Sequence, residues 1–460
     1  MRFLFCVVAV VGSGCAGHQL VGQVTAMPSK GLLVQQVNVF DGEHGIGARD
    51  VRIKDGVVAE VAEAGTLIAT EGEERIDGTG RTLLPGLIDM HAHFETHGEP
   101  LWAVGFPNGP DIANAYVWAG VTTALVMQAA ADQFRIARKI REGELAGPHL
   151  YLTGPRLTAP DGFPINLYRG LLGPLAFLAT GAMHTATTAD EARADVDRTA
   201  DEFAPEFDKI TSDAFPPGTP KLTTEAMTAA IKRSRELKIR PTAHIGDPAD
   251  VMLAAEAGLE LFAHPPTGGV LGPEQLARLA ELKIPFVSTQ RFLTAPDEIA
   301  EDRGSVLERE LLTPKLLASF NEKPADFKYP AVPEGFDVAS ALKHYRENLR
   351  TNLKHLHEAG VPVFAGTDAG SPGVVPGAAI HRELRAMVEA GLSNEEVLRA
   401  ATSAPADFLD PAKKSFGRVA VGQRADLVIV EGDPLTNISA TENVREVFVD
   451  GARLQRVRRE

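Results

Sequence analysis

Between residues 83 and 416, short apolar runs alternate with longer segments rich in Ala, Glu and Leu. Eight of these runs are predicted strands: LLPGLIDMHAHF, VTTALVMQ, HLYLTGPRL, FDKITS, RPTAHIG, LELFAHP, IPFVSTQ and VPVFAGTDAG. Successive strands that are separated by a helix usually pair in parallel, because the helix makes the crossover connection. The pattern predicts an α/β fold class, a closed (β/α)8 TIM barrel whose chemistry lies at the carboxyl ends of its strands.

The two segments that flank this region have a different texture. LLVQQVNVFDG and VRIKDGVVAEV come before it, and GRVAVGQRADLVIVEGDPL and VREVFVDG follow it, with Gly and Asp between short alternating runs. Such runs are typical of antiparallel strands and turns. We therefore expect residues 31–82 and 417–456 to form one small β-sandwich domain, and residues 83–416 to form the barrel. The longest irregular insertion, about residues 291–340, follows the seventh strand, where it can build a lid or a substrate wall.

Residues 1–17, MRFLFCVVAVVGSGCAG, have one arginine, a short apolar stretch and small residues at the end. This pattern predicts an export signal, and it is too short to span a bilayer as a stable helix. GSGC resembles a bacterial lipoprotein cleavage box, except that Gly12 stands where Leu or Val is usual, so lipidation of Cys15 and ordinary cleavage both stay open. We expect an exported bacterial protein, either periplasmic or tethered to the membrane as a lipoprotein through Cys15.

Composition narrows the class of partner. The chain has 460 residues, of which 44% are hydrophobic and 23% charged, so it can bury a large core. Its net charge of −15 argues against a nucleic-acid partner. The sequence does not determine the oligomeric state.

Polar residues suited to metal binding stand at the ends of several predicted strands. His91 and His93 are two residues apart, so in a strand they point to the same face and can bind one cation. The pair alone is weak evidence, because histidines also satisfy hydrogen bonds in cores. His244, His264 and Asp368 each end an apolar run of their own, and a barrel would bring them to the same rim. Imidazole nitrogens and a carboxylate suit Zn²⁺ and related divalent ions.

In the predicted barrel, Lys209 of the strand FDKITS lies at the same rim. A lysine amine has a reference pKa of about 10.4 and is normally a cation that cannot bind a metal. Desolvation near bound metal favours the neutral amine, which can react with CO₂ to give an anionic carbamate. From this segment alone, a salt bridge from Lys209 to Asp208 or Glu206 is the simpler interpretation.

Several segments together resemble the amidohydrolase superfamily, specifically its imidazolonepropionase-like and prolidase-like metal-dependent hydrolases. They are LPGLIDMHAHF, FDKI, TAHIG, LELFAHPP, AGTDAG, HRELRAMVEAGLSNEEVLRAATSAPADFL and GQRADLVIVEGDPL, and the resemblance covers about residues 31–455. It implies two divalent metal ions, zinc by preference. His91, His93 and Asp368 would bind the more buried ion, His244 and His264 the other, and carboxylated Lys209 would bridge them. The sequence departs from the prolidase-like pattern at FDKI, where FIKI is usual, and this bears on whether one or two ions bind.

The resemblance implies hydrolysis of a carbon–nitrogen amide bond in a small substrate, such as an Xaa-Pro dipeptide or an N-acyl amino acid. The metal ions would activate a water molecule, and Asp368 would carry its proton to the leaving nitrogen. Candidate substrate contacts are Arg156, Tyr168, Arg291 and His381.

Three alternatives stay open at this point. A cyclic amide or lactone hydrolase needs the same metals and differs in pocket shape. A deaminase of the same superfamily usually has one metal, no lysine on strand four, and a glutamate shortly after the strand-five histidine, where this chain has HIGD. Outside the enzymes, a degenerate periplasmic binding protein could use the barrel as a scaffold, although the complete ligand set argues against it.

Overall fold

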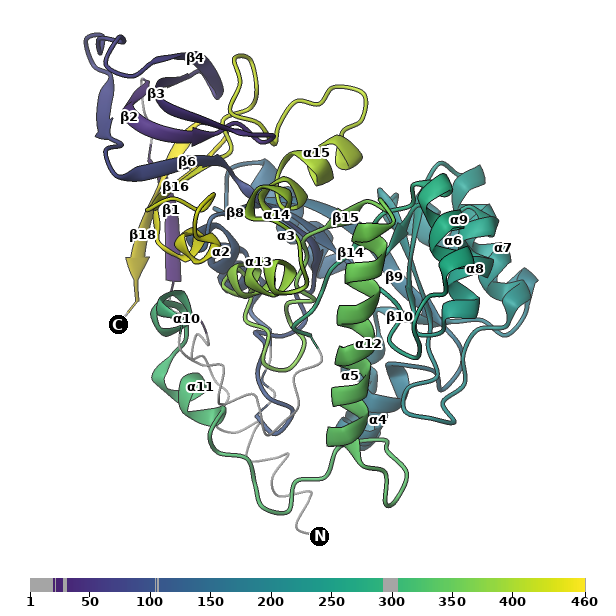
Figure 1. Cartoon of the computed structure of the whole chain (residues 1–460). Coiled ribbons are helices and arrows are strands. Elements are labelled where there is room, and N and C mark those ends of the chain that lie inside the picture. The colour runs from purple at the N-terminus through teal and green to yellow at the C-terminus, as the bar shows by residue number, and fades with distance from the viewer. Residues whose placement is uncertain are drawn as a thin grey trace.

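The computed structural model describes residues 20, 22–27, 31–103, 105, 107–292 and 305–459. Two nine-stranded sheets organise this part of the chain (Figure 1). The predicted export signal and Cys15 lie outside the described residues. Within the described ranges, no helix has both the length and the apolar composition that crossing a membrane requires.

Eight parallel strands form the barrel, and each one overlaps a strand predicted from the sequence. In sheet order they are β7 (Leu87–Ala92), β8 (Val121–Val126), β9 (His149–Thr158), β11 (Phe207–Ser212), β12 (Arg240–Ile245), β13 (Leu261–Phe262), β14 (Phe286–Val287) and β15 (Val363–Phe364). A short additional strand, β10 (Met183–Thr185), pairs with β9 in parallel. The predicted α/β barrel is confirmed.

Backbone hydrogen bonds join the first strand of the barrel to the segment that follows the last. The Met90 N–H donates to the Ala365 carbonyl at 3.0 Å, and the His93 N–H donates to the Ala369 carbonyl at 2.8 Å. The Asp368 N–H donates in the other direction, to the His91 carbonyl, at 2.8 Å. These hydrogen bonds place the first strand of the barrel beside the segment that follows the last strand, so that His91 and His93 lie close to Asp368.

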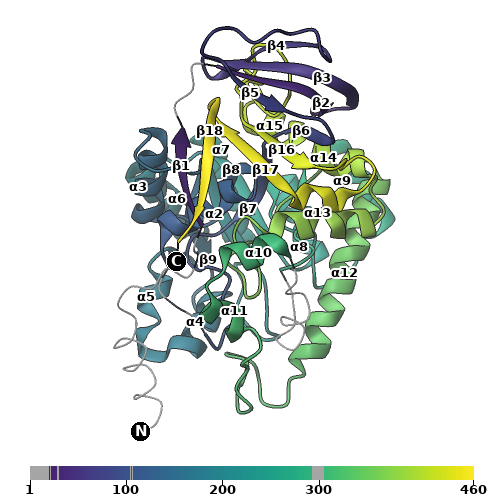
Figure 2. The ribbon, with the colours of Figure 1, turned by 90° about the vertical axis from the view of Figure 1, so that its left-hand side faces the viewer.

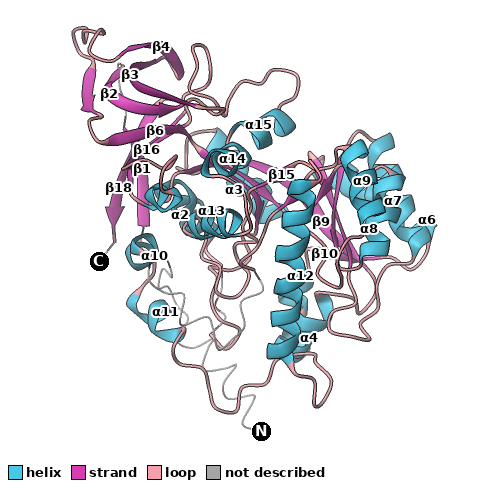
Figure 3. Ribbon diagram, in the orientation of Figure 1, coloured by secondary structure: helices cyan, strands magenta, loops and turns pink. Residues whose placement is uncertain are grey.

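Helices surround these strands (Figure 3). They are α2 (Gly109–Trp118), α3 (Ala131–Arg141), α6 (Ala189–Phe203), α7 (Thr224–Glu236), α8 (Pro248–Ala257), α9 (Pro273–Leu282), α12 (Val338–Glu358) and α13 (Ala379–Glu389), followed by α14 (Asn394–Ala400) and α15 (Ser403–Leu409). Buried Ile231, Val251 and Leu279 on three of these helices share one core with Ile210 and Phe262 of the strands. This packing of apolar helix faces onto the barrel fixes the strands and hence the residues at their ends.

The two chain ends build the second sheet together, as predicted. Its strands follow the order β1 (Gly22–Met27), β18 (Ala452–Arg458), β17 (Val444–Val449), β16 (Leu427–Glu431), β6 (Arg81–Pro85), β2 (Leu32–Phe40), β3 (Gly45–Lys54) and β4 (Val57–Glu63), with β5 (Glu74–Asp77) on β2. Antiparallel pairing of β6 with β16 joins the two ends, and Val34, Val51, Leu427 and Phe448 pack in one core. The sheet is mixed, because β2 pairs with β5 and β6 in parallel.

One strand of this sheet lies outside the predicted range. Residues 22–27 form β1, which pairs with β18 in antiparallel register from Gly22 opposite Arg458 to Met27 opposite Arg453. Figure 2 shows the two strands beside each other. The described part of the fold therefore begins close to the end of the predicted export signal.

Two segments at the carboxyl end of the barrel extend beyond the strands. After β9 come α4 (Ile165–Leu172), a 3-10 turn (Gly173–Leu175) and α5 (Phe177–Thr180). The described part of the predicted insertion contains α10 (Val306–Leu311) and α11 (Pro314–Ser319) and leads into α12. Figures 1 and 2 both place α4 and α11 at the same end of the molecule.

Candidate active site

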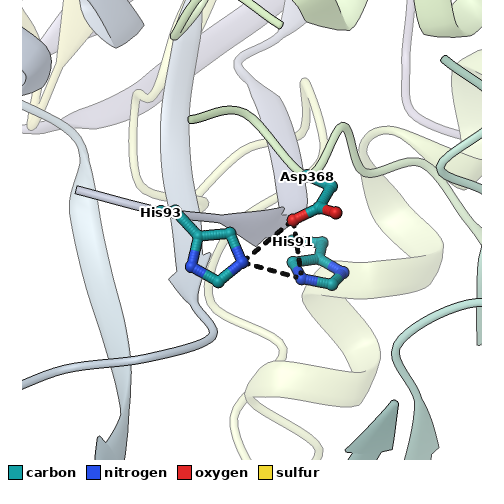
Figure 4. A group of neighbouring side chains, drawn as sticks. All are labelled: His91, His93 and Asp368. Atoms are coloured by element: carbon teal, nitrogen blue, oxygen red, sulfur yellow. Dashed lines mark hydrogen bonds and ion pairs between the residues drawn. The ribbon is translucent and has the colours of Figure 1, made fainter. Parts of the chain in front are cut away.

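His91, His93 and Asp368 converge at the carboxyl end of β7 (Figure 4). Asp368 Oδ1 lies 3.2 Å from His91 Nε2 and 2.9 Å from His93 Nε2, and the two Nε2 atoms are 3.3 Å apart. All three side chains are buried or nearly so. The prediction that β7 and the end of the last strand supply neighbouring ligand-type residues agrees with this geometry.

A buried carboxylate, Asp89, holds the two segments of this cluster together. Asp89 Oδ1 accepts hydrogen bonds from the His91 N–H and the Thr367 N–H, both at 3.0 Å. Its Oδ2 accepts from Thr367 Oγ1 at 2.6 Å. Asp368 itself has a φ of 56°, a left-handed conformation that aspartate tolerates better than most residues. These contacts fix the backbone that aims Asp368 at the two imidazoles.

His264 and His244 extend the cluster through ring contacts. The ring centroids of His91 and His264 are 4.5 Å apart, and those of His264 and His244 are 4.7 Å apart. His264 Nδ1 lies 2.7 Å from Thr289 Oγ1, and His244 Nε2 lies 2.7 Å from Asp213 Oδ2. Because a carboxylate only accepts hydrogen bonds, His244 donates from Nε2, which leaves its Nδ1 as the atom that could bind a metal ion.

The protonation state of two of the buried imidazoles, His91 and His264, suits metal binding. His91 Nδ1 donates to the Ala263 carbonyl at 3.0 Å, so its Nε2 lone pair faces Asp368. Burial lowers the pKa of both His91 and His264 well below the usual value. Both rings are therefore neutral near pH 7, which is the form that binds a metal ion.

Lys209 lies on β11 and is fully buried. Its Nζ donates to Met127 Sδ at 3.6 Å, and among the described residues no carboxylate forms an ion pair with it. Asp208 accepts a hydrogen bond from a serine of α7 instead, and Glu206 accepts one from a backbone amide of β9. Burial, with the nearby Arg156, lowers the pKa of Lys209 well below its usual value. The salt-bridge interpretation of Lys209 is therefore wrong in this structure, and a neutral amine is favoured.

The donor set fits divalent metal ions. Lys209 is one of the groups that affect the pKa of His91 and of His264, so its amine lies at the same site. Neutral imidazoles, a carboxylate and a buried amine without an anionic neighbour are the groups that a pair of such ions and a bridging carbamate require. The predicted ligands His91, His93, Lys209, His244, His264 and Asp368 are thus gathered at one end of the barrel.

A cavity of about 190 Å³ opens over this cluster. Its polar lining includes Glu95, Thr96, Gln128, Arg156 and Tyr168. Its apolar wall includes Phe163, Leu167 and Leu171 from the region of α4, Phe215 after β11, and Tyr329, Leu342 and Tyr345 from the insertion and α12. The insertion after the seventh strand therefore contributes Tyr329 to the wall of the cavity.

Two of the four predicted substrate contacts line the cavity and two do not. Arg156 at the end of β9 and Tyr168 of α4 are lining residues. The assignment of His381 is wrong: it is fully buried on α13, where its Nε2 donates to the Ala119 carbonyl at 2.9 Å, and burial lowers its pKa to about 4. Arg291 is also absent from the described lining residues, because it lies beside the charged residues of α13.

Sequence reasoning did not identify Asp89, Glu95, Asp213 and Thr289. Asp89 and Glu95 stand two residues before His91 and two after His93, so proximity to the HAH motif could have indicated them. Asp213 directly follows β11 and Thr289 is the second residue after β14, and the carboxyl ends of strands were already the expected place for functional groups. Their pairing with His244 and His264 needs the three-dimensional structure.

Comparison with known proteins agrees with this geometry. The model of the amidohydrolase family matches residues 82–454. A segment of 68 residues is 46% identical to the dihydroorotase of Citrifermentans bemidjiense, although the match covers only 15% of this chain and 16% of that protein. The match therefore spans less than a fifth of the relative's length.

Two solved structures share the whole fold. A Xaa-Pro dipeptidase with bound methionine in the active site has a TM-score of 0.73 and 20% identity, over 92% of this chain and 99% of that chain. A prolidase complexed with N-methylphosphonate-L-proline has a TM-score of 0.70 and 21% identity, over 94% and 100%. Because the family match covers most of its length, this chain belongs to the amidohydrolase family.

Proposed function

We propose that the protein hydrolyses the amide bond of a small substrate, either a dipeptide such as Xaa-Pro or an N-acyl amino acid. The observation that carries the proposal is the convergence of His91, His93 and Asp368 beside a buried Lys209 that has no anionic partner among the described residues. The export signal predicted in residues 1–17 would place this activity in the periplasm or, with a lipidated Cys15, at a membrane surface.

The residues that would hold two divalent ions, zinc by preference, follow from the site. His91, His93 and Asp368 would bind one ion, His244 and His264 the other, and carboxylated Lys209 would bridge them. Divalent ions in such a site lower the pKa of a water molecule and polarise the scissile carbonyl. The positions of Asp213 and Thr289 against His244 and His264 would hold those two rings in the orientation that binding needs.

Asp368 is the residue that would move the proton. Burial opposes its ionisation, but His91, His93 and His264 outweigh burial and hold the pKa of Asp368 well below its usual value. Asp368 is therefore a carboxylate that can accept a proton from the attacking water and transfer it to the leaving nitrogen.

The cavity supports a small substrate that carries a carboxylate. Arg156 is almost fully buried in the wall, next to Tyr168, and both groups can bind a carboxylate on the leaving side of the substrate. Of the two structural neighbours named above, one is a Xaa-Pro dipeptidase and the other is a prolidase in complex with N-methylphosphonate-L-proline. This similarity favours a dipeptide substrate. The local match to a dihydroorotase favours cyclic amide hydrolysis as the second candidate.

The test combines metal analysis with a substrate screen. The purified protein, assayed with Xaa-Pro, Xaa-Arg and N-acyl amino acid libraries, should contain two divalent ions per chain and hydrolyse members of at least one library. Ring opening of dihydroorotate alone would favour the second candidate. Hydrolysis of none, together with rapid deamination of a purine or pyrimidine, would contradict the proposal.

A carbamate on Lys209 has its own readout. Protein equilibrated with ¹³C-bicarbonate should show one carbamate carbon signal by NMR, and Lys209→Gln should lack it. Lys354→Gln is the matched control, because that lysine is exposed on α12, and it should keep the signal. A signal that survives Lys209→Gln would show that the carbamate lies elsewhere.

A further inference from the structure

Glu95 is an unusual carboxylate in the wall of the cavity. It stands two residues after His93, and its Oε2 lies 3.4 Å from His93 Nδ1. Both of its carboxylate oxygens are buried, and neither accepts a hydrogen bond from a described residue. Asp89 and Asp213, the other carboxylates around the cluster, each accept at least one hydrogen bond of 2.7 Å or less. Apart from this long contact with His93, Glu95 has no hydrogen-bond donor among the described residues.

A buried carboxylate with few hydrogen-bond donors is unfavourable, because it loses hydrogen bonds to water on burial and forms few with the protein. Such groups are rare in folded proteins and call for an explanation, such as a catalytic role or a bound ion. Glu95 lines the cavity, so a ligand can reach it. The group that would complete Glu95 is a hydrogen-bond donor with a positive charge.

Arg156 presents the opposite charge in the same cavity. It is 7% exposed, its Nε is buried without a hydrogen-bond partner among the described residues, and its charge interacts with that of Glu95. Even so, Glu95 and Arg156 form no ion pair with each other in the described structure. A cavity that keeps an acid and a base separate can bind a small molecule with one charge of each sign.

We propose that Glu95 binds the free α-ammonium group of the substrate, so that the protein selects dipeptides with an unblocked amino terminus over N-acyl amino acids. This inference rests on the proposed amide hydrolysis and narrows its substrate class. In a dipeptide, the ammonium nitrogen is two bonds from the scissile carbonyl carbon, so its counter-ion has to lie close to the metal ligands. Glu95 lies there, in contact with His93, whereas Arg156 is left for the carboxylate on the leaving side.

The rest of the cavity suits such a substrate. Its small volume, about 190 Å³, favours a dipeptide over a longer peptide. Phe163 and Phe215 pack edge to face with ring centroids 5.9 Å apart, and Tyr345 packs against Phe215 at 5.7 Å. This aromatic wall can hold an apolar side chain or a proline ring between the two charged ends.

A competing interpretation is that Glu95 only orients His93, as carboxylates behind metal-binding histidines often do. The two roles differ in what a Glu95→Gln variant loses. An orienting role predicts loss of bound metal and an equal loss for every substrate. An ammonium-binding role predicts a loss that depends on whether the substrate carries a free amine.

The experiment measures binding and turnover of matched pairs of ligands. Calorimetry compares a dipeptide of the Xaa-Pro type with its N-acetyl derivative on the wild-type protein and on Glu95→Gln, with metal content determined for both. We expect the wild type to bind the free dipeptide about 10- to 100-fold more tightly than the acetylated one, as hydrogen bonds between charged groups would give. Glu95→Gln should lose most of that preference while it retains its metal. Asp132→Asn, which removes an exposed carboxylate of α3, is the matched control and should keep the preference.

The outcomes separate the two proposals. Equal binding of free and acetylated dipeptide by the wild type would overturn the inference, as would a Glu95→Gln variant that loses metal and binds both ligands equally weakly. If the preference is present and depends on Glu95 but no dipeptide is hydrolysed, the inference stands and the proposed function fails. Hydrolysis of both ligands with equal kcat/KM would leave the proposed function intact and refute the role of Glu95.

Discussion

Two groups of histidine and carboxylate side chains in this protein have the same donor atoms and opposite surroundings. His91, His93 and Asp368 form one group, and His149, Asp426 and Asp450 form the other, and in each the ligand-type atoms lie within 4.8 Å of one another. The first group lies at the carboxyl end of the barrel. The second lies at the opposite end, where His149 begins β9 and the two aspartates belong to the terminal sheet region.

The charges around the second group are already balanced. His149 Nε2 lies 3.4 Å from a carboxylate oxygen of each aspartate, and Arg424 Nε lies 2.5 Å from Asp426 Oδ2. Burial alone would lower the pKa of His149, but its contacts with Asp426 and Asp450 outweigh burial and raise the pKa to about 9. His149 is therefore a cation at neutral pH and part of an ion network that joins the barrel to the terminal sheet.

In the first group, burial lowers the pKa of His91 well below its usual value, whereas Glu95 and Asp368 outweigh burial and raise the pKa of His93. No arginine is paired with Asp368 in the described structure. The comparison shows that residue types and spacing do not define a metal site by themselves. A metal site also needs ligands in the deprotonated form and a negative charge that no protein cation has neutralised.

The largest expected effect is a loss of catalytic activity when the Asp368 carboxylate of the first group is removed. Asp368→Asn removes the proposed proton carrier and one ligand, so kcat/KM should fall by about 10²- to 10⁴-fold or more. Asp426→Asn, the matched change in the second group, should leave kcat/KM within a few fold of wild type. Steady-state kinetics on metal-replete protein measures both. Undiminished turnover in Asp368→Asn would rule out its role in catalysis.

A second test uses stabilisation by metal. A divalent ion at 100 times its Kd stabilises the folded state by about 2.7 kcal/mol, which raises the melting temperature. We expect Zn²⁺ to raise the melting temperature of the wild type and of His149→Gln alike, and to have little effect on His93→Gln. Differential scanning calorimetry with and without metal provides the comparison. Loss of the metal effect in His149→Gln would move the metal site to the opposite end of the barrel.

Most of the fold follows from local sequence patterns. All eight barrel strands were predicted because buried parallel strands are apolar runs between helical segments. The strand lengths were not, since β13, β14 and β15 are only two residues long and the rest of each run is loop. β1 was missed because its partner, β18, is at the other end of the chain, and no local pattern reports such a pairing.

The same distinction between local and distant information applies to the site. The candidate ligands at the strand ends could be predicted because the position in a strand alone places them at the rim of a barrel. His381 was misplaced because the sequence places it at the start of a helix but does not say which way that helix turns it. Glu95 was missed because its significance lies in the donors that it lacks, which depends on every residue packed around it.

The smallest expected effect concerns the pH dependence of the second group. The pKa of His149 is about 9 in the folded protein and about 6.5 when unfolded, so its ion pairs stabilise the fold fully below pH 6.5 and lose that contribution as the pH rises through 9. We expect His149→Gln to lower the free energy of unfolding by about 1–3 kcal/mol at pH 6. At pH 10 the difference from wild type should be close to zero. Urea unfolding of both proteins at the two pH values measures it, and a difference that is the same at both would show that His149 stabilises the fold by packing instead of by charge.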